Sequence, residues 1–310
     1  MDGQGEIFAS LLCAEGAAGV ESGSARITPV NQNFRQSRLR ILSKRYCQFY
    51  LNKYVYMFNF EYPPKETKIE SELENKIDLL KDYVKEVYSK SAEGDPKKEM
   101  QVKEFNRHNE DILDFIEELT KEEKISPEDM EAAKLAAVLH DVAKFDAPLI
   151  KHGFEGAKIA EKKLKELNFD EKTIQQVKNS IERHMGPIPG FMENEAKKWE
   201  EQTGEKIEFP RPKNTVDKAL YDADMLSLIS FHGIEKILTI RKNTDIFKEE
   251  DEKTAAKEGI TIEEARWRSA LKSAYEAADS LFSESAKRKA NQFLTEMEEF
   301  TKKSLNKKIA

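Results

Sequence analysis

Cysteine is scarce in this sequence, and its scarcity excludes two common kinds of site. Only Cys13 and Cys47 occur among the 310 residues. These two thiols supply neither a disulfide framework nor a Cys-x-x-Cys zinc site. We therefore expect a protein of a reducing compartment, the cytoplasm.

Long hydrophobic runs are also missing. No apolar stretch approaches the roughly 18 to 20 residues that a helix needs to span a bilayer. The formal net charge of −7 argues against a general nucleic-acid-binding scaffold, because such scaffolds carry a positive field. The sequence thus predicts neither a membrane protein nor a protein that coats nucleic acid.

Glycine and proline are few, with 13 and 10 residues respectively, which argues against a β-sandwich or a low-complexity chain. What the sequence has instead is apolar residues at helical spacing, such as Ile69, Leu73 and Ile77. The pattern continues from residue 66 almost to the C-terminus. We predict an all-α fold in which residues 66–310 form one helical domain.

Two regions precede this domain. Residues 1–37 carry Gly, Ser and Ala without a period, and we predict a flexible leader outside the core. Residues 38–65 crowd tyrosine and phenylalanine beside arginine and lysine. That composition can bind single-stranded nucleic acid, but we favour an irregular extension packed on the core, because no nucleic-acid-binding signature accompanies it.

Prolines and glycines interrupt the helical pattern between residues 185 and 213. We predict a long insertion there, with a polar helix around Trp199. Two roles remain open for it. It is either a lid or specificity element beside a functional site, or a decoration away from it.

Four predicted helices place an ionisable side chain on an apolar face, where a hydrophobic residue normally stands. These side chains are His108, His140, His184 and Asp224. One such histidine is normally a hydrogen-bonded core residue, but four coincident cases indicate a shared site. Buried charges are commonly paired or coordinate metals, and imidazole with carboxylate suits Mn, Fe, Co, Zn or Mg.

The motifs around these residues resemble those of the HD-domain metal-dependent phosphohydrolases. His140-Asp141-Val142-Ala143-Lys144 is similar to the family's His-Asp-x-Gly-Lys, with alanine in place of the usual glycine. His152-Gly153-Phe154-Glu155-Gly156-Ala157 and the segment 181–184 look like the next two histidine motifs. The segment 220–226 is similar to the Asp-Ala-Asp-x-Leu helix.

The resemblance implies an HD-type helical bundle and a set of site residues. Those implied to hold a divalent metal are His108, His140, Asp141 and Asp224. Those implied to assist catalysis are Lys144, His152 and His184. One or two ions are compatible with this set. With two, Asp141 would bridge them and the last two histidines would be ligands; with one, these histidines would contact phosphate or donate a proton.

Two features of the motifs leave alternatives open. Lys144 is placed to pair with a phosphate oxygen, yet it could equally pair with Asp146 or be a surface charge. Met225 and Ser227 stand where the family usually has an arginine and a second aspartate. The second feature would fit a regulator that binds metal or a nucleotide without catalysis.

The function that the resemblance implies is hydrolysis of a phosphate ester by a metal-activated water, with a small, nucleotide-like substrate. The alternatives are the non-catalytic regulator and a helical interaction protein with ordinary core histidines. Nucleic acid is a possible but not favoured partner, no membrane partner is expected, and the oligomeric state is left open.

Overall fold

The computed structural model of the protein describes residues 68–186, 191–243 and 247–309. In these ranges the chain forms helices and no strand, which confirms the predicted all-α fold. They belong to the second of two units, Thr67–Ala310; the predicted leader (1–37) and extension (38–65) lie outside the described residues. None of the described helices has the length and hydrophobicity that crossing a bilayer requires.

The helices are α3 (Lys68–Ala92), α4 (Pro96–Glu122), α5 (Pro127–Leu139), the 3-10 helix η1 (Leu149–Lys151), α6 (His152–Glu166), α7 (Glu171–Arg183), α8 (Phe191–Thr203), α9 (Thr215–Ile229), α10 (Phe231–Asn243), α11 (Lys248–Glu258), α12 (Ile262–Asp279) and α13 (Glu284–Ile309).

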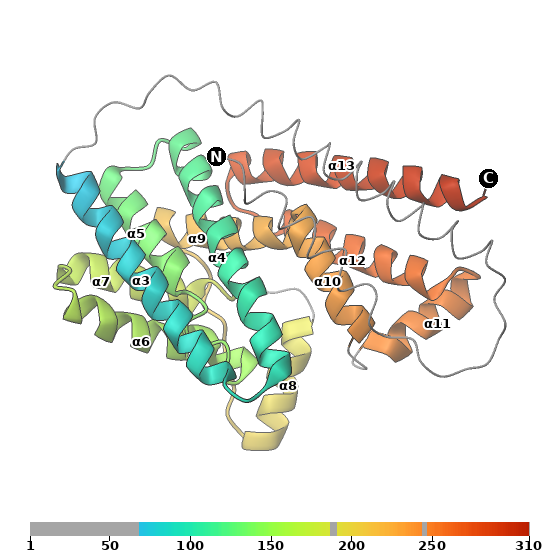
Figure 1. Ribbon diagram of the computed structural model, residues 1–310, viewed down its shortest axis with the longest axis horizontal. Helices are drawn as coiled ribbons and strands as arrows, with labels where there is room; N and C mark the ends of the chain where they lie inside the picture. The colour runs from blue at the N-terminus through green and yellow to red at the C-terminus, as the bar shows by residue number, and fades with distance from the viewer. Residues whose placement is uncertain (1–67, 187–190, 244–246, 310) are drawn as a thin grey trace, which may run out of the picture. The chain divides into compact units, whose positions relative to one another are not determined.

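Helix α5 is enclosed by α3, α4, α7 and α9, which all pack against it (Figure 1). Every residue from Ala132 to Leu139 is buried, so the helix has no single apolar face. Its alanines let the neighbouring helices approach closely. Its buried cation, Lys134, pairs with Glu117 of α4 at 2.8 Å and with Glu74 of α3 at 3.2 Å. These pairs satisfy a charge that would otherwise be costly inside the bundle.

Only one of the two ends of α5 lies where the sequence predicts it. Its start matches what the sequence predicts, since a serine before proline and acidic residues marks a helix start: the Ser126 side chain caps the helix by accepting a hydrogen bond from the Asp129 backbone at 3.1 Å. Its end does not. The apolar run through His140 predicts a helix that continues to Lys144, which is wrong: residues 140–146 form successive turns. One of these turns joins the Lys144 N–H to the Asp141 carbonyl at 2.8 Å.

Helix α9 is buried almost throughout and packs against α4, α5 and α7 as well as α12 and α13. Asp217 fixes where it begins. Its side chain forms a capping box with Asn214. It also accepts hydrogen bonds from Ser180 and Arg183 of α7, both at 2.7 Å. Because Asp217 is fully buried, this network holds α7 and α9 in one register.

The insertion contains the predicted polar helix, α8, which carries Trp199 and packs against η1. Lys151 of η1 anchors it, with its ammonium 2.7 Å from a Glu205 carboxylate oxygen and 4.8 Å from the centroid of the Trp199 ring. In a small apolar cluster, Ile150 and Met185 pack against Trp199, Ile207 and Phe209. The insertion is therefore fixed beside the segment that leads into His152.

The corner between α9 and α10 depends on a glycine. A methyl group on Gly233 would lie 2.3 Å from the carbonyl oxygens of Ser227 and Leu228, closer than such atoms can approach. Glycine to alanine normally stabilises a helix, but here we expect Gly233→Ala to lower the free energy of unfolding by roughly 3 kcal/mol, the upper end for overpacking. Urea unfolding measures it, and an alanine variant more stable than the wild type would contradict it.

Candidate metal centre

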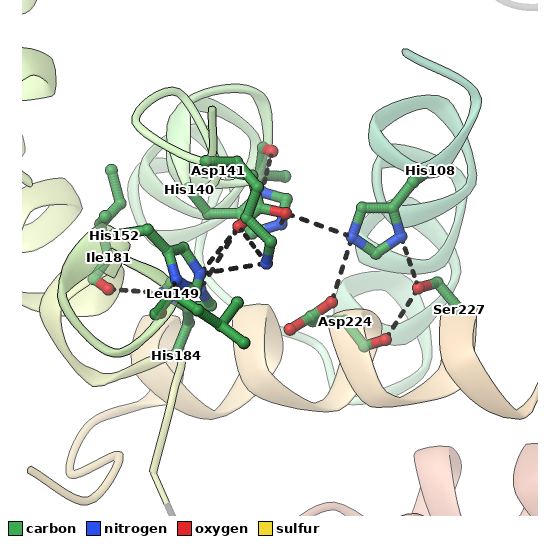
Figure 2. Close-up of polar contacts among 11 residues, drawn as sticks. His108, His140, Asp141, Leu149, His152, Ile181, His184, Asp224 and Ser227 are labelled. Carbon is green, nitrogen blue, oxygen red and sulfur yellow. Dashed lines mark hydrogen bonds and ion pairs between the residues drawn. The ribbon is translucent and has the colours of Figure 1, made fainter. Parts of the chain in front are cut away.

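The residues singled out in the sequence come together at one place in the bundle (Figure 2). They are brought there by α4, α9 and the chain just beyond the ends of α5, η1 and α7. Their ligand atoms form two groups, in each of which they lie within 4.8 Å of one another. The first group is His108, His140 and Asp224, and the second is Asp141, His152 and His184.

In the first group, His108 Nε2 lies 3.3 Å from an Asp224 carboxylate oxygen, and the rings of His108 and His140 are 5.4 Å apart between centroids. The His140 ring is completely buried. Its Nε2 has no hydrogen-bond partner among the described residues. A buried ring nitrogen without a partner is costly, and a cation held between these three side chains would satisfy it.

In the second group, Asp141 Oδ1 lies 3.0 Å from His152 Nε2 and 3.8 Å from His184 Nε2. The two imidazole nitrogens face each other at 3.2 Å. All three residues are buried. This is one carboxylate and two imidazoles around a common point, the ligand chemistry that suits a divalent transition metal.

Asp141 lies between the two groups. Its Oδ2 faces the first, 3.6 Å from His140 Nε2 and 3.9 Å from His108 Nε2, while its Oδ1 faces the second. His140 and Asp141 can both point inward although adjacent, because the helix has ended. Within an α-helix, adjacent side chains point about 100° apart. One carboxylate is thus placed to bridge two cations.

The hydrogen bonds assign the same tautomer to all four imidazoles. His140, His152 and His184 each place Nδ1 against the carbonyl oxygen three residues earlier. His108 places Nδ1 2.8 Å from Ser227 Oγ. That hydroxyl donates to the Asp224 carbonyl, so it accepts from the histidine. Each Nδ1 therefore carries the proton, and each Nε2 turns a free lone pair toward the centre, as metal-binding histidines do.

The charge states also match those of metal ligands. Burial lowers the pKa of His184 to about 3, helped by the neighbouring His152 and His140. Burial likewise lowers the pKa of His108. For Asp224, burial raises the pKa, but the nearby imidazoles, His108 foremost among them, outweigh it and hold the pKa below its usual value. Neutral imidazole and ionised carboxylate are the forms that bind metal.

For Asp141, burial again raises the pKa, but the charge of Lys144 and the neighbouring histidines hold it well below its usual range. Lys144 Nζ lies 3.2 Å from Asp141 Oδ1 and 3.3 Å from His152 Nε2. The alternative partner Asp146 instead accepts a hydrogen bond from Ser91 at 2.6 Å. In the structure Lys144 is therefore half-buried against the candidate centre and pairs with Asp141 instead of Asp146.

Part of the chain matches a known protein family. Residues 89–229 match the family model of the HD domain. The chain contains an HD domain. Its structure is also similar to that of an HD-superfamily hydrolase from Bacillus thuringiensis, with a TM-score of 0.50 and 18% sequence identity over 77% of this chain and 99% of that one. That likeness concerns the fold. Among curated proteins, no sequence matches the chain.

Two glycines explain why α6 of the HD domain comes so close to the centre. A methyl group on Gly153 would lie 3.1 Å from both His184 Cε1 and the Ile181 carbonyl oxygen. One on Gly156 would lie 3.2 Å from the His140 carbonyl oxygen. These positions belong to the His-Gly-Phe-Glu-Gly-Ala motif. Its glycines let α6 pack directly on the chain that carries the ligands.

Sequence reasoning missed the roles of three residues. Ser227, noted only as a departure from the family pattern, orients His108; its position three residues after Asp224, on the same helix face, was an available signal. Asp222 accepts backbone hydrogen bonds from Phe282 and Ser283, both at 2.8 Å, and so caps the turn before α13. The third residue is Lys236 of α10, whose ammonium lies 4.5 Å from the centroid of the Phe105 ring. Nothing in the sequence distinguishes it from the chain's other lysines.

Ser227 allows a test of the His108 orientation. We expect Ser227→Ala to weaken metal binding by about 10- to 100-fold, because losing a partner of a ligating histidine typically costs that much. Competition with a chromophoric chelator measures the affinity. Ser180→Ala is the matched control, since Ser180 is buried and hydrogen-bonded to Asp217 but forms no hydrogen bond with any of the six ligand residues. Equal metal affinity of the Ser227 variant and the wild type would contradict the expectation.

Proposed function

We propose that this HD domain hydrolyses the phosphate ester of a small, nucleotide-like molecule with the help of one or two divalent metal ions. The observation that carries the proposal is the position of Asp141, whose two carboxylate oxygens face two separate groups of ligands. Five ligand atoms with free lone pairs or negative charge around one bridging carboxylate fit two metal ions. Two-metal sites are common in enzymes that cleave phosphate esters.

The residues present divide the work as follows. His108, His140 and Asp224 would hold the first ion, His152 and His184 the second, and Asp141 both. When bound, such ions supply an activated water and offset charge on the phosphoryl oxygens. His184 is suited to be a ligand and not a proton donor, because a group with a pKa of about 3 carries no proton to give near neutral pH.

Lys144 supplies a positive charge that needs no metal. Its ammonium lies against Asp141 and His152, and its flexible stem lets it turn toward a phosphate oxygen placed at the centre. The insertion is anchored on η1, directly before His152, and therefore lies beside the second group of ligands. We assign it the role of shaping access to this side of the centre.

The test is a substrate panel on the purified full chain. Phosphate or nucleotide release is followed for mono-, di- and triphosphate nucleotides, cyclic nucleotides and generic phosphoesters, each with Mn, Fe, Co, Zn or Mg. Turnover that depends on metal and disappears in Asp141→Asn supports the proposal. Bound metal without turnover of any phosphoester overturns it and favours a non-catalytic regulator.

A further inference from the structure

A second lysine, Lys236 of α10, lies at the edge of the centre. Its ammonium is 4.5 Å from the centroid of the Phe105 ring, and the ammonium of Lys144 is 5.9 Å from the same centroid. Phe105 stands one turn before His108 on α4, and their rings meet edge to face with centroids 6.5 Å apart. Two ammonium groups therefore lie near the Phe105 ring, beside the first group of ligands.

Lys236 lacks the carboxylate partner that other inward-facing cations among the described residues have. Lys134 pairs with Glu117 and Glu74, and buried Arg241 pairs with Asp251 at 2.8 Å. Lys236 is partly buried, yet no carboxylate of the described residues lies within ion-pair distance of its ammonium. Burial lowers the pKa of Lys236, and the charge of Lys144 lowers it further. The carboxylates Asp141, Asp224 and Glu104 raise this pKa, but by less. An anion bound between the two lysines would relieve both effects.

The surrounding structure holds Lys236 in this place. Ser230 ends α9 and accepts a hydrogen bond from the Gly233 backbone at 3.2 Å, which closes the corner into α10. One turn before Lys236, the His232 ring lies 3.4 Å from an Asp111 carboxylate oxygen of α4. These contacts direct the same face of α10 toward α4, so the lysine is positioned by its helix and not by a loose loop.

We propose that Lys236 binds the substrate's phosphate together with Lys144, and that the substrate is a phosphomonoester and not a phosphodiester. The inference rests on the proposed function, because it concerns what that site holds. A phosphomonoester carries about −1.5 to −2 charges near neutral pH, whereas a diester carries one. Two ammonium groups beside the metal ligands, of which that of Lys236 has no carboxylate partner among the described residues, match the larger charge. Both ammonium groups lie at cation–π distance from the same Phe105 ring, 4.5 and 5.9 Å from its centroid, so one ring positions both charges.

The test compares Lys236→Gln with Lys218→Gln in the full-length, metal-loaded chain. Lys218 is an exposed lysine that also lies near an aromatic ring, 5.9 Å from the centroid of Phe282, but away from the centre. Inorganic phosphate is the probe, and its binding is measured by calorimetry. We expect Lys236→Gln to weaken phosphate binding by about 10- to 100-fold, the range for a hydrogen bond to a charged group, with bound metal unchanged. Lys218→Gln should bind phosphate as the wild type does.

The outcomes separate this inference from the proposed function. Phosphate affinity unchanged in Lys236→Gln, or fully lost in Lys218→Gln, overturns the role of Lys236 whatever the substrate panel gives. Weaker phosphate binding in a chain that turns over no phosphoester supports the anion site and defeats only the hydrolase. Lys236→Arg keeps the charge and should restore most of the affinity, which distinguishes a lost charge from a disturbed fold. If the chain is active, Lys236→Gln should raise KM for phosphomonoesters more than for phosphodiesters, and the reverse order would overturn the substrate class.

Discussion

Asp141→Asn should remove most of the metal from both halves of the centre. Asparagine keeps the shape of the side chain but has no charge and only one oxygen, so it cannot face both ligand groups as the two Asp141 oxygens do. Loss of a residue that merely orients a ligand costs about 10- to 100-fold in metal affinity. Loss of a bridging ligand should therefore exceed about 100-fold. Elemental analysis after dialysis, followed by chelator competition, measures the effect.

Asp146→Asn is the matched control for this substitution. It makes the same chemical change five residues later in the same turn region, at an exposed carboxylate that is bonded to Ser91. Its metal content should equal that of the wild type. If Asp141→Asn bound as much metal as the control while remaining folded by circular dichroism, the histidines would have to be regarded as ordinary core residues.

Helical periodicity predicted the parts of this centre that lie within helices. His108 and Asp224 were found because each occupies a position on an apolar stripe of α4 and α9, and such a position faces the core. The cap at Ser126 was equally readable, since a serine before proline and acidic residues marks a helix start. The residue types within a few positions are enough to predict which face of a helix is buried and where the helix starts.

Helix ends were harder to predict, and the centre depends on them. His140, His152 and His184 are each the residue that closes a helix, where the chain is free to turn a ring inward and to satisfy Nδ1 with a carbonyl three residues before. Periodicity extends a helix until a breaker appears, and neither His140 nor Asp141 is one. Where α5 ends, the chain makes tertiary contacts that local periodicity does not encode, such as the approach of Gly156 to the His140 carbonyl.

Hydrophobic periodicity does not predict contacts between helices that are far apart in the sequence. The link from Ser227 to His108 joins α9 to α4 across 119 positions, and no local signal sets that pairing. Lys236 looks like any lysine of a charged helix. What distinguishes it is the corner at Gly233 and the ring of Phe105, which only the folded chain brings together.

The metal-free protein should lose stability as the pH falls below about 6.5, and His184 should be a main reason. Its pKa is about 3 in the folded chain and about 6.5 in an unfolded one. Between these values the unfolded state binds a proton that the folded state does not, so acid favours unfolding. The contribution is fully present above pH 6.5 and declines by about 1.4 kcal/mol per pH unit below it. Buried His108, whose pKa is also lowered, adds a change of the same sign.

His184→Asn isolates this contribution, because asparagine does not titrate. Urea unfolding of the chelator-treated proteins at pH 7 and pH 5 should show the wild type losing about 2 kcal/mol more than the variant, which is 1.5 pH units at the slope above. The carboxylates do not produce this difference, since the lowered pKa values of Asp141 and Asp224 affect stability only nearer their ordinary value of about 3.9. Equal losses in the two proteins would mean that His184 takes up a proton in the folded state, and a ring that protonates there would be a poor metal ligand.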